Sequence, residues 1–197
     1  LPLKIQNPSS YKFALYTFLV IIVVLYSAKT ISRNYAWKND FSLSTTDVKT
    51  SGNSAKVRMS AGGSMLDKAK EEKNPAEKQR LLNESIKHLY RSLELYTTYI
   101  QPMLLMGNAY YEAKDYNNSI KFFENCLKID ANYELAKNNL ADALARKEKE
   151  ETALALVKKE PTEANYINLS LVYYNLGRFQ KCADAAAMAL TVNPKSE

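Results

Sequence analysis

The chain offers few side chains with the types and spacing that catalysis or metal binding requires. Its one histidine, His88, has no carboxylate or cysteine at metal-ligand spacing, so we expect it to be structural. Cys126 and Cys182 fall where a helix favours a small buried side chain, and we expect no disulfide between them. The segment Ala61-Gly-Gly-Ser64 lacks the signature of a phosphate-binding loop. We therefore predict no catalytic residue, metal site or cofactor in this chain.

The 197 residues carry a formal net charge of +6, which raises the question of nucleic-acid binding. Acidic residues are interspersed among the basic ones, as in 68–78 and 146–151, and such mixed runs are typical of solvated helix faces. We see no basic stripe interleaved with aromatics, so we expect no nucleic-acid partner. Five cations near the start favour contact with anionic lipid headgroups: Lys4, Lys12, Lys29, Arg33 and Lys38.

Two stretches of the chain repeat one pattern of small and aromatic residues. Residues Gly107, Tyr110, Ser119, Phe123, Cys126 and Leu127 correspond, at equal spacing, to Ser170, Tyr173, Cys182, Ala186, Ala189 and Leu190. Small residues fall where two antiparallel helices would cross, and aromatics fall where they would interlock. Self-similarity at a fixed period predicts a solenoid of helical hairpins.

This pattern resembles the tetratricopeptide repeat (TPR), in which a small residue of a first helix meets a small residue of a second. Aligning those two positions gives Gly62, Gly107, Ala141 and Ser170 for the first helix and Ser85, Ser119, Ala153 and Cys182 for the second. The step from Gly107 to Ala141 is the 34 residues of the family. We predict an all-α solenoid of about four repeats over 55–196, with boundaries at 55–99, 100–133, 134–162 and 163–196.

Two repeats depart from the period. The first carries about eleven extra residues, in the charged stretch 67–78, and such insertions form loops or extend helices. In the third, Pro161 ends the second helix early. Elsewhere we expect the aromatics Tyr110, Phe123, Tyr173 and Phe179 to be core residues.

A long apolar run lies ahead of the repeats. The sixteen residues between Lys12 and Lys29 contain no charge and no proline. We predict a transmembrane helix over 11–31, preceded by a flank over 1–10 and followed by a partly irregular connector over 32–54. Lys12, Lys29, Arg33 and Trp37 would lie at the membrane interface. A secretory signal peptide and a buried core helix are the alternatives.

The segment after this helix has the pattern Arg33-Asn-x-x-Trp37, followed by Val48-Lys49 and by Asn53-Ser-Ala-Lys56. It resembles the junction between the last membrane helix and the C-terminal TPRs of membrane O-mannosyltransferases and their bacterial relatives. That resemblance implies a parent enzyme whose catalytic residues lie outside this chain. Because the chain begins at Leu1 rather than Met, we expect further sequence upstream.

Charge and resemblance disagree about the side of the membrane. Lys4 and Lys12 precede the helix and four cations follow it before residue 50, which weakly favours repeats in the cytoplasm. The resemblance implies the opposite side. We expect the repeats on the non-cytoplasmic side, in a periplasm or an endoplasmic reticulum lumen.

TPR arrays commonly bind proteins or extended peptides along the concave face formed by the first helices. The resemblance places there Leu104, Asn108, Tyr111, Glu112, Asn138, Asn139, Asp142, Arg146, Asn168, Leu171, Tyr174 and Asn175. Asparagines can hold a peptide backbone through paired donors and acceptors, although they are also tolerated on any polar helix face. Leu104, Ala164 and Asn168 occupy the cation positions of the family's carboxylate clamp, so we expect no clamp.

Two functions follow from these patterns. In the first, the chain is the acceptor- or partner-binding end of a membrane glycosyltransferase. In the second, it is a self-standing, membrane-anchored TPR adaptor that assembles a protein complex. The junction pattern favours the first.

Overall fold

The computed structural model of the protein describes residues 8–194. That range contains nine α-helices and one 3-10 helix and no strand, so the predicted all-α class is confirmed. Lys4, most of the predicted flank 1–10, and the last two residues of the predicted fourth repeat lie outside the described residues.

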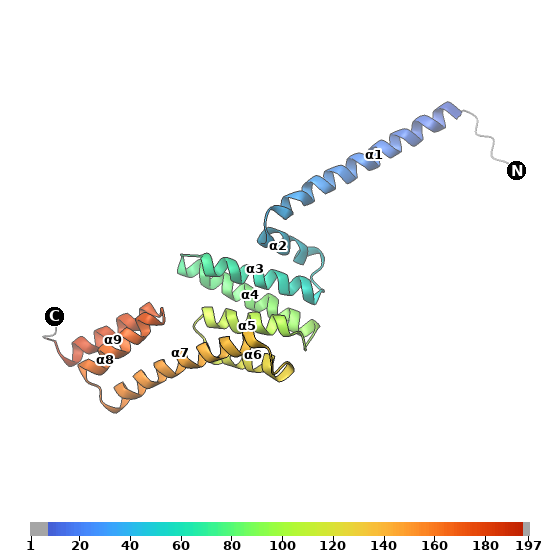
Figure 1. The fold of residues 1–197 in the computed structure, drawn as a ribbon. Helices are drawn as coiled ribbons and strands as arrows, with labels where there is room; N and C mark the ends of the chain where they lie inside the picture. Colours follow the sequence, from blue (N-terminus) through green and yellow to red (C-terminus); the bar gives the residue numbers. More distant parts are fainter. Residues whose placement is uncertain (1–7, 195–197) are drawn as a thin grey trace.

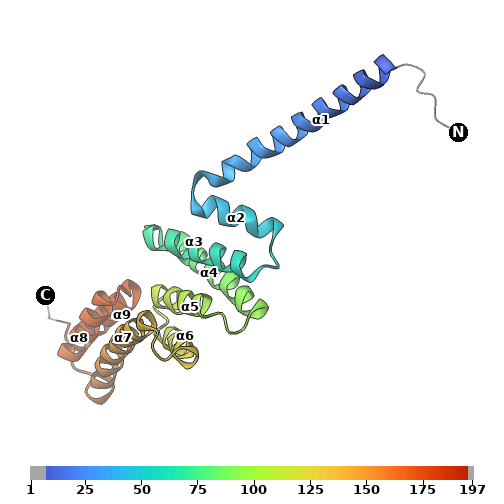
Figure 2. The same cartoon turned by 45° about the vertical axis from the view of Figure 1, so that its right-hand side comes forward.

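Helix α1, Pro8–Asn34, projects away from the other helices (Figures 1 and 2). Its side chains from Tyr11 onward are almost all exposed. The segment Tyr11–Lys38 is long and apolar enough to cross a membrane, and none of its most apolar window is buried within the protein. By length and composition, α1 therefore fits either a membrane span or a signal sequence.

The connector is more helical than we predicted. After the short 3-10 helix Tyr35–Lys38, helix α2 runs over Asp40–Thr50. Asn39 starts α2 with a reciprocal cap, because its Oδ1 accepts from the Ser42 amide at 2.8 Å while Ser42 Oγ accepts from the Asn39 amide at 3.3 Å. The sequence interpretation overlooked this cap, which supplies partners for amides that would otherwise be unsatisfied at the helix start.

Three helical hairpins follow, of which the first two stack directly on each other and the third packs on the second half of α7. Their helices are α3 (Ala55–Glu71) with α4 (Pro75–Leu95), α5 (Ile100–Glu112) with α6 (Tyr116–Ile129), and α8 (Glu163–Asn175) with α9 (Phe179–Val192). The eleven extra residues of the first hairpin lengthen its helices rather than form a long loop. Two equivalent turn residues, Lys114 and Gly177, adopt left-handed backbone with φ of 63° and 68°. They let the second helix fold back on the first.

The helices of each hairpin cross at the predicted small residues. A Cβ on Gly107 would lie 2.3 Å from Phe123 Cε1, and one on Gly62 would lie 2.6 Å from Leu89 Cγ. Ser119 Oγ donates to the Gly107 carbonyl at 2.9 Å, and Ser85 Oγ donates to the Gly62 carbonyl at 2.7 Å. The main chains therefore approach closely and satisfy the buried serines.

The third predicted repeat is not a hairpin. Residues Glu134–Lys159 form one continuous helix, α7, so our expectation of two helices there was wrong (Figure 1). The residue equivalent to Lys114 is Glu148, inside a run of good helix formers that contains neither glycine nor a capping side chain. Ion pairs one turn apart, Asp142–Arg146 at 3.3 Å and Lys147–Glu151 at 3.6 Å, support the helix across the expected turn.

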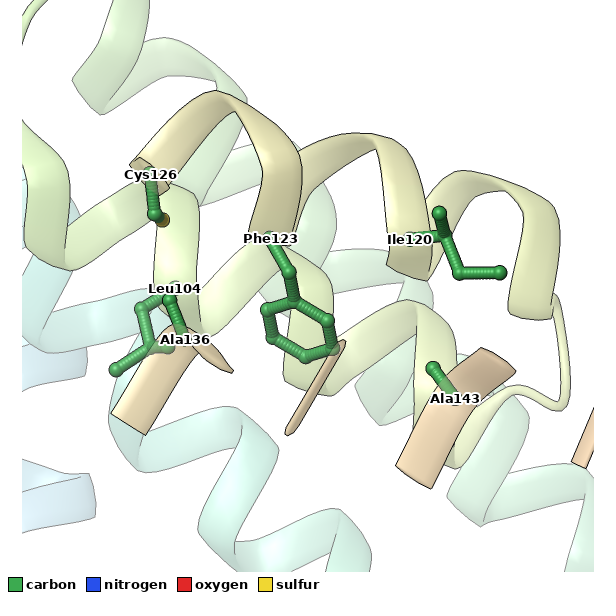
Figure 3. Close-up of a cluster of buried hydrophobic side chains, with 6 residues drawn as sticks. All are labelled: Leu104, Ile120, Phe123, Cys126, Ala136 and Ala143. Atoms are coloured by element: carbon green, nitrogen blue, oxygen red, sulfur yellow. The ribbon is translucent and has the colours of Figure 1, made fainter. Parts of the chain in front are cut away.

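The main core lies between α5, α6 and the first half of α7. Figure 3 shows Phe123 beneath α6, between the helices that carry Leu104 and Ala143. A second cluster around Leu66 and Leu82 joins α3, α4 and α5, and a third around Tyr173 joins the second half of α7 to α8 and α9.

Phe179 departs from the predicted core. Its side chain is 66% exposed, whereas Tyr116, the equivalent residue of α6, is 3% exposed. Tyr116 is covered by Tyr111 and by the Arg178 guanidinium, whose Cζ lies 5.2 Å from its ring centroid. Among the described residues no further hairpin follows α9 to cover Phe179.

Candidate functional site

The structure brings the two asparagines of α5 and α7 together. Asn139 Nδ2 donates to Asn108 Oδ1 at 2.8 Å, which ties the first helices of the second and third predicted repeats. Within the described residues, this bond leaves the Asn108 amide nitrogen as a donor and the Asn139 oxygen as an acceptor. A peptide main chain presents a carbonyl oxygen and an amide hydrogen that match this pair.

One helical turn further on, Tyr111, Asp142 and Arg146 form a second contact between α5 and α7. The Tyr111 hydroxyl donates to Asp142 Oδ2, and Arg146 Nε donates to the same oxygen at 3.3 Å. The Arg146 guanidinium also lies over the Tyr111 ring, with Cζ 5.2 Å from the centroid. The hydroxyl bond lowers the pKa of Asp142, while burial and the same bond raise the pKa of Tyr111. Asp142 is therefore held as a carboxylate.

A third polar contact joins α5 to α4. Glu112 accepts from Lys78 Nζ at 2.9 Å, and both side chains are about three-quarters buried. Nearby, burial lowers the pKa of Lys114, whose main chain makes the turn into α6. These groups position α5 against α4 and lie at one end of the row that contains Asn108 and Tyr111.

One residue predicted for the surface is buried. Leu104 is 9% exposed and belongs to the core with Phe123 and Ala136, so its place on a binding surface was wrong. The aligned position faces α6 and α7 rather than solvent. Asn138 is exposed on α7, next to Asn139.

The remaining predicted residues lie on α8, apart from the α5–α7 row. Leu171 and Tyr174 are 56% and 61% exposed, and Asn168 and Asn175 are also exposed. They are separated from the row because α7 continues straight and places α8 beside its second half. The structure therefore brings together Asn108, Asn139, Tyr111, Asp142 and Arg146, and does not add α8 to them within one chain.

At the membrane-proximal end, Lys12, Lys29, Arg33 and Trp37 are all exposed on or just after α1. Arg33 Nη2 lies 3.4 Å from Asp47 Oδ1, a solvent-exposed pair that links the end of α1 to α2. Trp37 is 67% exposed in the 3-10 helix.

Two features were missed by sequence reasoning. An open hollow lies between α2 and α3, where Ser44 Oγ and Ser64 Oγ are 2.5 Å apart and Lys68 Nζ lies 4.2 Å over the Phe41 ring. We overlooked it because we took the α2 segment for a partly irregular connector. The other is Arg178, which donates to Glu150 Oε1 at 2.7 Å and to the Lys114 carbonyl.

The histidine and the two cysteines that the sequence analysis considered for chemistry lie in the following surroundings. His88 is 8% exposed, with Nδ1 3.1 Å from Arg58 Nη1, and burial together with the Arg58 charge lowers its pKa. Cys126 and Cys182 are free thiols, and burial raises the pKa of Cys126 to about 11. Across the described range, no group of three or more histidine, cysteine, aspartate or glutamate side chains is arranged to hold a metal ion.

The chain matches a family model, a curated protein and solved structures of a further protein. The family described as "Tetratricopeptide repeat" matches residues 100–133. "Protein STIP1 homolog" of Dictyostelium discoideum is 28% identical over 96 residues, and the match covers 46% of this chain but only 17% of that protein. Two crystal structures of MamA are 16% identical, with TM-scores of 0.45 and 0.44; they cover 77% and 85% of this chain and 85% and 88% of their own.

Proposed function

Because this chain is a helical solenoid that contains a tetratricopeptide repeat, we propose that it is a membrane-anchored protein-interaction module. Its partner is a protein that presents an extended segment to the row of polar residues on α5 and the first half of α7. Helix α1 anchors the module.

The observation that carries this proposal is the Asn108–Asn139 pair. The two amides hold each other in place while keeping one donor and one acceptor for a partner's main chain. Main-chain recognition of this kind gives affinity with little dependence on the partner's side chains. Next to the pair, the Arg146 guanidinium lies over the Tyr111 ring and its charge is balanced by Asp142, so this surface favours an aromatic side chain of the partner.

The lack of cations at the clamp positions separates this surface from one that binds a peptide's C-terminal carboxylate. Leu104 is buried there, and Ala164 and Asn168 are uncharged. We therefore expect internal segments to bind as well as C-terminal ones.

The test is peptide display against the full chain held in detergent micelles. We expect enriched extended peptides to lose affinity by about 1–3 kcal/mol when Asn108→Ala and Asn139→Ala are combined, because the main-chain hydrogen bonds are lost. Asn117→Ala, an exposed asparagine on α6, is the matched control and should bind normally. If the double variant bound the peptides as tightly as the parent chain, the row of polar residues on α5 and α7 would not be the binding site.

Membrane anchoring is supported by the length and apolarity of Tyr11–Lys38 and by the basic and aromatic residues near its ends. A protein anchored by α1 stays in the membrane fraction after alkaline carbonate extraction, whereas a processed signal segment leaves a shorter, extractable chain. Finding the shorter, extractable chain would mean that α1 is a signal peptide and not a membrane anchor.

The finer hypothesis is that the module belongs to a membrane glycosyltransferase and lies on the non-cytoplasmic side. It is supported by the junction residues Arg33, Asn34 and Trp37 and by the connection from α1 into repeats. The matches described above do not extend to that enzyme family. Several hundred upstream codons that encode further apolar spans would support the glycosyltransferase hypothesis, whereas a nearby initiator Met would favour the membrane-anchored adaptor. Protease accessibility in spheroplasts or sealed microsomes tests on which side of the membrane the repeats lie.

A further inference from the structure

One edge of the solenoid combines tyrosines with lysines and contains no acidic residue. It consists of residues 49–56, from the end of α2 to the start of α3, and of residues 95–100, which connect α4 to α5; we call it the loop edge. The two segments are neighbours, because Ser92 Oγ in the last turn of α4 donates to the Ala55 carbonyl at 2.7 Å. The loop edge is therefore one continuous surface.

The aromatic and basic side chains of the loop edge are accessible. Tyr96 is 56% exposed and Leu95 is 36% exposed, and the rings of Tyr96 and Tyr99 lie 5.7 Å apart. Lys49 and Lys56 are exposed, and within the described part of the chain neither has a carboxylate at ion-pair distance. Tyrosines beside unpaired lysines are typical of surfaces that lie at the interface between water and lipid.

The connection from α1 to the solenoid places this edge toward the membrane. Ser42 Oγ of α2 donates to the carbonyl of the buried Ala36 at 2.8 Å, and Ser44 Oγ lies 2.5 Å from Ser64 Oγ of α3. These contacts hold the end of α1 to α2, and α2 to α3. Figures 1 and 2 both show the α2–α3 turn and the α4–α5 loop on the side of the solenoid toward which α1 projects.

The opposite edge has a different composition. In both views the α3–α4 turn and the hairpin of α8 and α9 lie away from α1. Residues 67–78, around the α3–α4 turn, contain four acidic and four basic residues, a mixture that is typical of a solvated surface. The two edges therefore differ in the way expected if one faces lipid and the other faces water.

We propose that the loop edge lies on the bilayer surface, with Tyr96 and Tyr99 among the lipid headgroups and Lys49 and Lys56 beside lipid phosphates. This inference rests on the proposed role of α1 as a membrane anchor. It adds a second contact, because an anchor alone leaves the solenoid free to tilt, whereas two contacts fix how the row on α5 and α7 is turned relative to the membrane.

A lipid surface suits the loop edge better than a soluble protein does. A stable protein interface needs roughly 20–30 residues on each side, and the loop edge is much smaller. Because α1 already holds the edge next to the bilayer, contact with lipid is intramolecular in effect, and a few weak contacts are enough. Each lysine also gains from anionic headgroups nearby.

Fluorescence quenching by brominated lipids tests the proposal in the full chain. The protein is reconstituted into vesicles of equal parts phosphatidylcholine and phosphatidylglycerol, with bromine on acyl carbons close to the headgroup. The one tryptophan of the chain, Trp37, reports on the anchor. In a Trp37→Phe background, Tyr96→Trp reports on the loop edge, and Phe179→Trp on the distant α9, at a residue 66% exposed, is the matched control.

We expect the Tyr96→Trp variant to lose fluorescence to the brominated lipid and to emit at shorter wavelength than the Phe179→Trp variant, which should not be quenched. If Trp37 is quenched in the parent chain but the Tyr96→Trp variant is not, the anchor stands and the loop edge does not touch the membrane. If Trp37 is not quenched, the anchor is wrong. In either case the Tyr96→Trp result decides the loop edge.

The lysines are tested in the same Tyr96→Trp background. Lys49→Gln/Lys56→Gln should reduce the quenching in these vesicles, because the attraction to phosphatidylglycerol is lost. Lys158→Gln/Lys159→Gln, two exposed lysines at the end of α7, is the matched control and should leave the quenching unchanged. An equal loss in both variants would contradict the placement of Lys49 and Lys56 beside the headgroups.

Discussion

Gly107 is the residue whose size the structure constrains most sharply. An added Cβ would lie 2.3 Å from the fully buried Phe123 ring, which has packed neighbours on its other side. We expect Gly107→Ala to lower the free energy of unfolding by about 1–3 kcal/mol, despite the better helix propensity of alanine. Chemical denaturation followed by circular dichroism measures the change.

Gly63 is the control for that prediction. Its added Cβ would be 3.4 Å from Leu105 Cδ1, an ordinary contact in the interior of α3. Gly63→Ala should be neutral or slightly stabilising. If both alanine variants had the same stability as the parent, the tight crossing at Gly107 would be wrong.

His88 gives the fold a pH dependence of known sign. Its pKa is lowered by burial and by Arg58, so in mildly acidic solution the unfolded chain binds more protons than the folded one. Stability should therefore rise with pH up to about the ordinary histidine pKa of 6.5 and then level off. We expect His88→Gln to flatten this profile between about pH 5 and pH 7 in thermal melts. If the stability of the His88→Gln variant kept the same dependence on pH, titratable groups other than His88 would be responsible for it.

At the scale of elements, α6 depends on the residue that begins it. Asp115 Oδ1 accepts from the Asn118 amide at 3.1 Å, and Oδ2 accepts from the Asn118 side chain at 2.7 Å. Asp115→Ala should cost about 1 kcal/mol of stability, because it leaves an amide at the helix start without its partner. Asn117→Ala in the same turn is the control, and a similar loss there would point to general sensitivity of this turn.

Over the whole molecule, Arg178 connects distant parts of the solenoid. It bonds Glu150 in the middle of α7 and the Lys114 carbonyl at the α5–α6 turn, and its side chain is only 16% exposed. We expect Arg178→Met to lower stability by roughly 1–3 kcal/mol and to speed amide exchange in α8 and α9, because Glu150 loses its main partner.

Arg91→Met is the matched control for Arg178. Arg91 pairs with Glu94 on an exposed helix face at 2.8 Å, where such pairs contribute little. If amide exchange in α8 and α9 were the same in the Arg178 variant as in the parent, Arg178 would not be the residue that holds the terminal hairpin on α7.

The hairpins and the apolar first helix could be predicted from the sequence because their signals are local. Small residues at equal spacing specify where two helices cross, and the structure confirms this at Gly62, Gly107 and Ser119. The apolar run of α1 is visible in composition alone. The pairing of Asn108 with Asn139 does not follow from that alignment, which matches Asn108 with Asp142 and Asn139 with Leu105; it depends on how α5 and α7 pack.

What only the tertiary structure decided depends on competition between local preferences and distant contacts. The repeat alignment predicts a turn near Glu148, but helix-forming residues and intrahelical ion pairs favour continuation, so α7 is unbroken and carries α8 away from α5. Leu104 is buried because three helices meet at its position, and Phe179 is exposed because no described hairpin covers it. Such outcomes depend on which surfaces meet in space, and the order of residues along one helix does not contain that information.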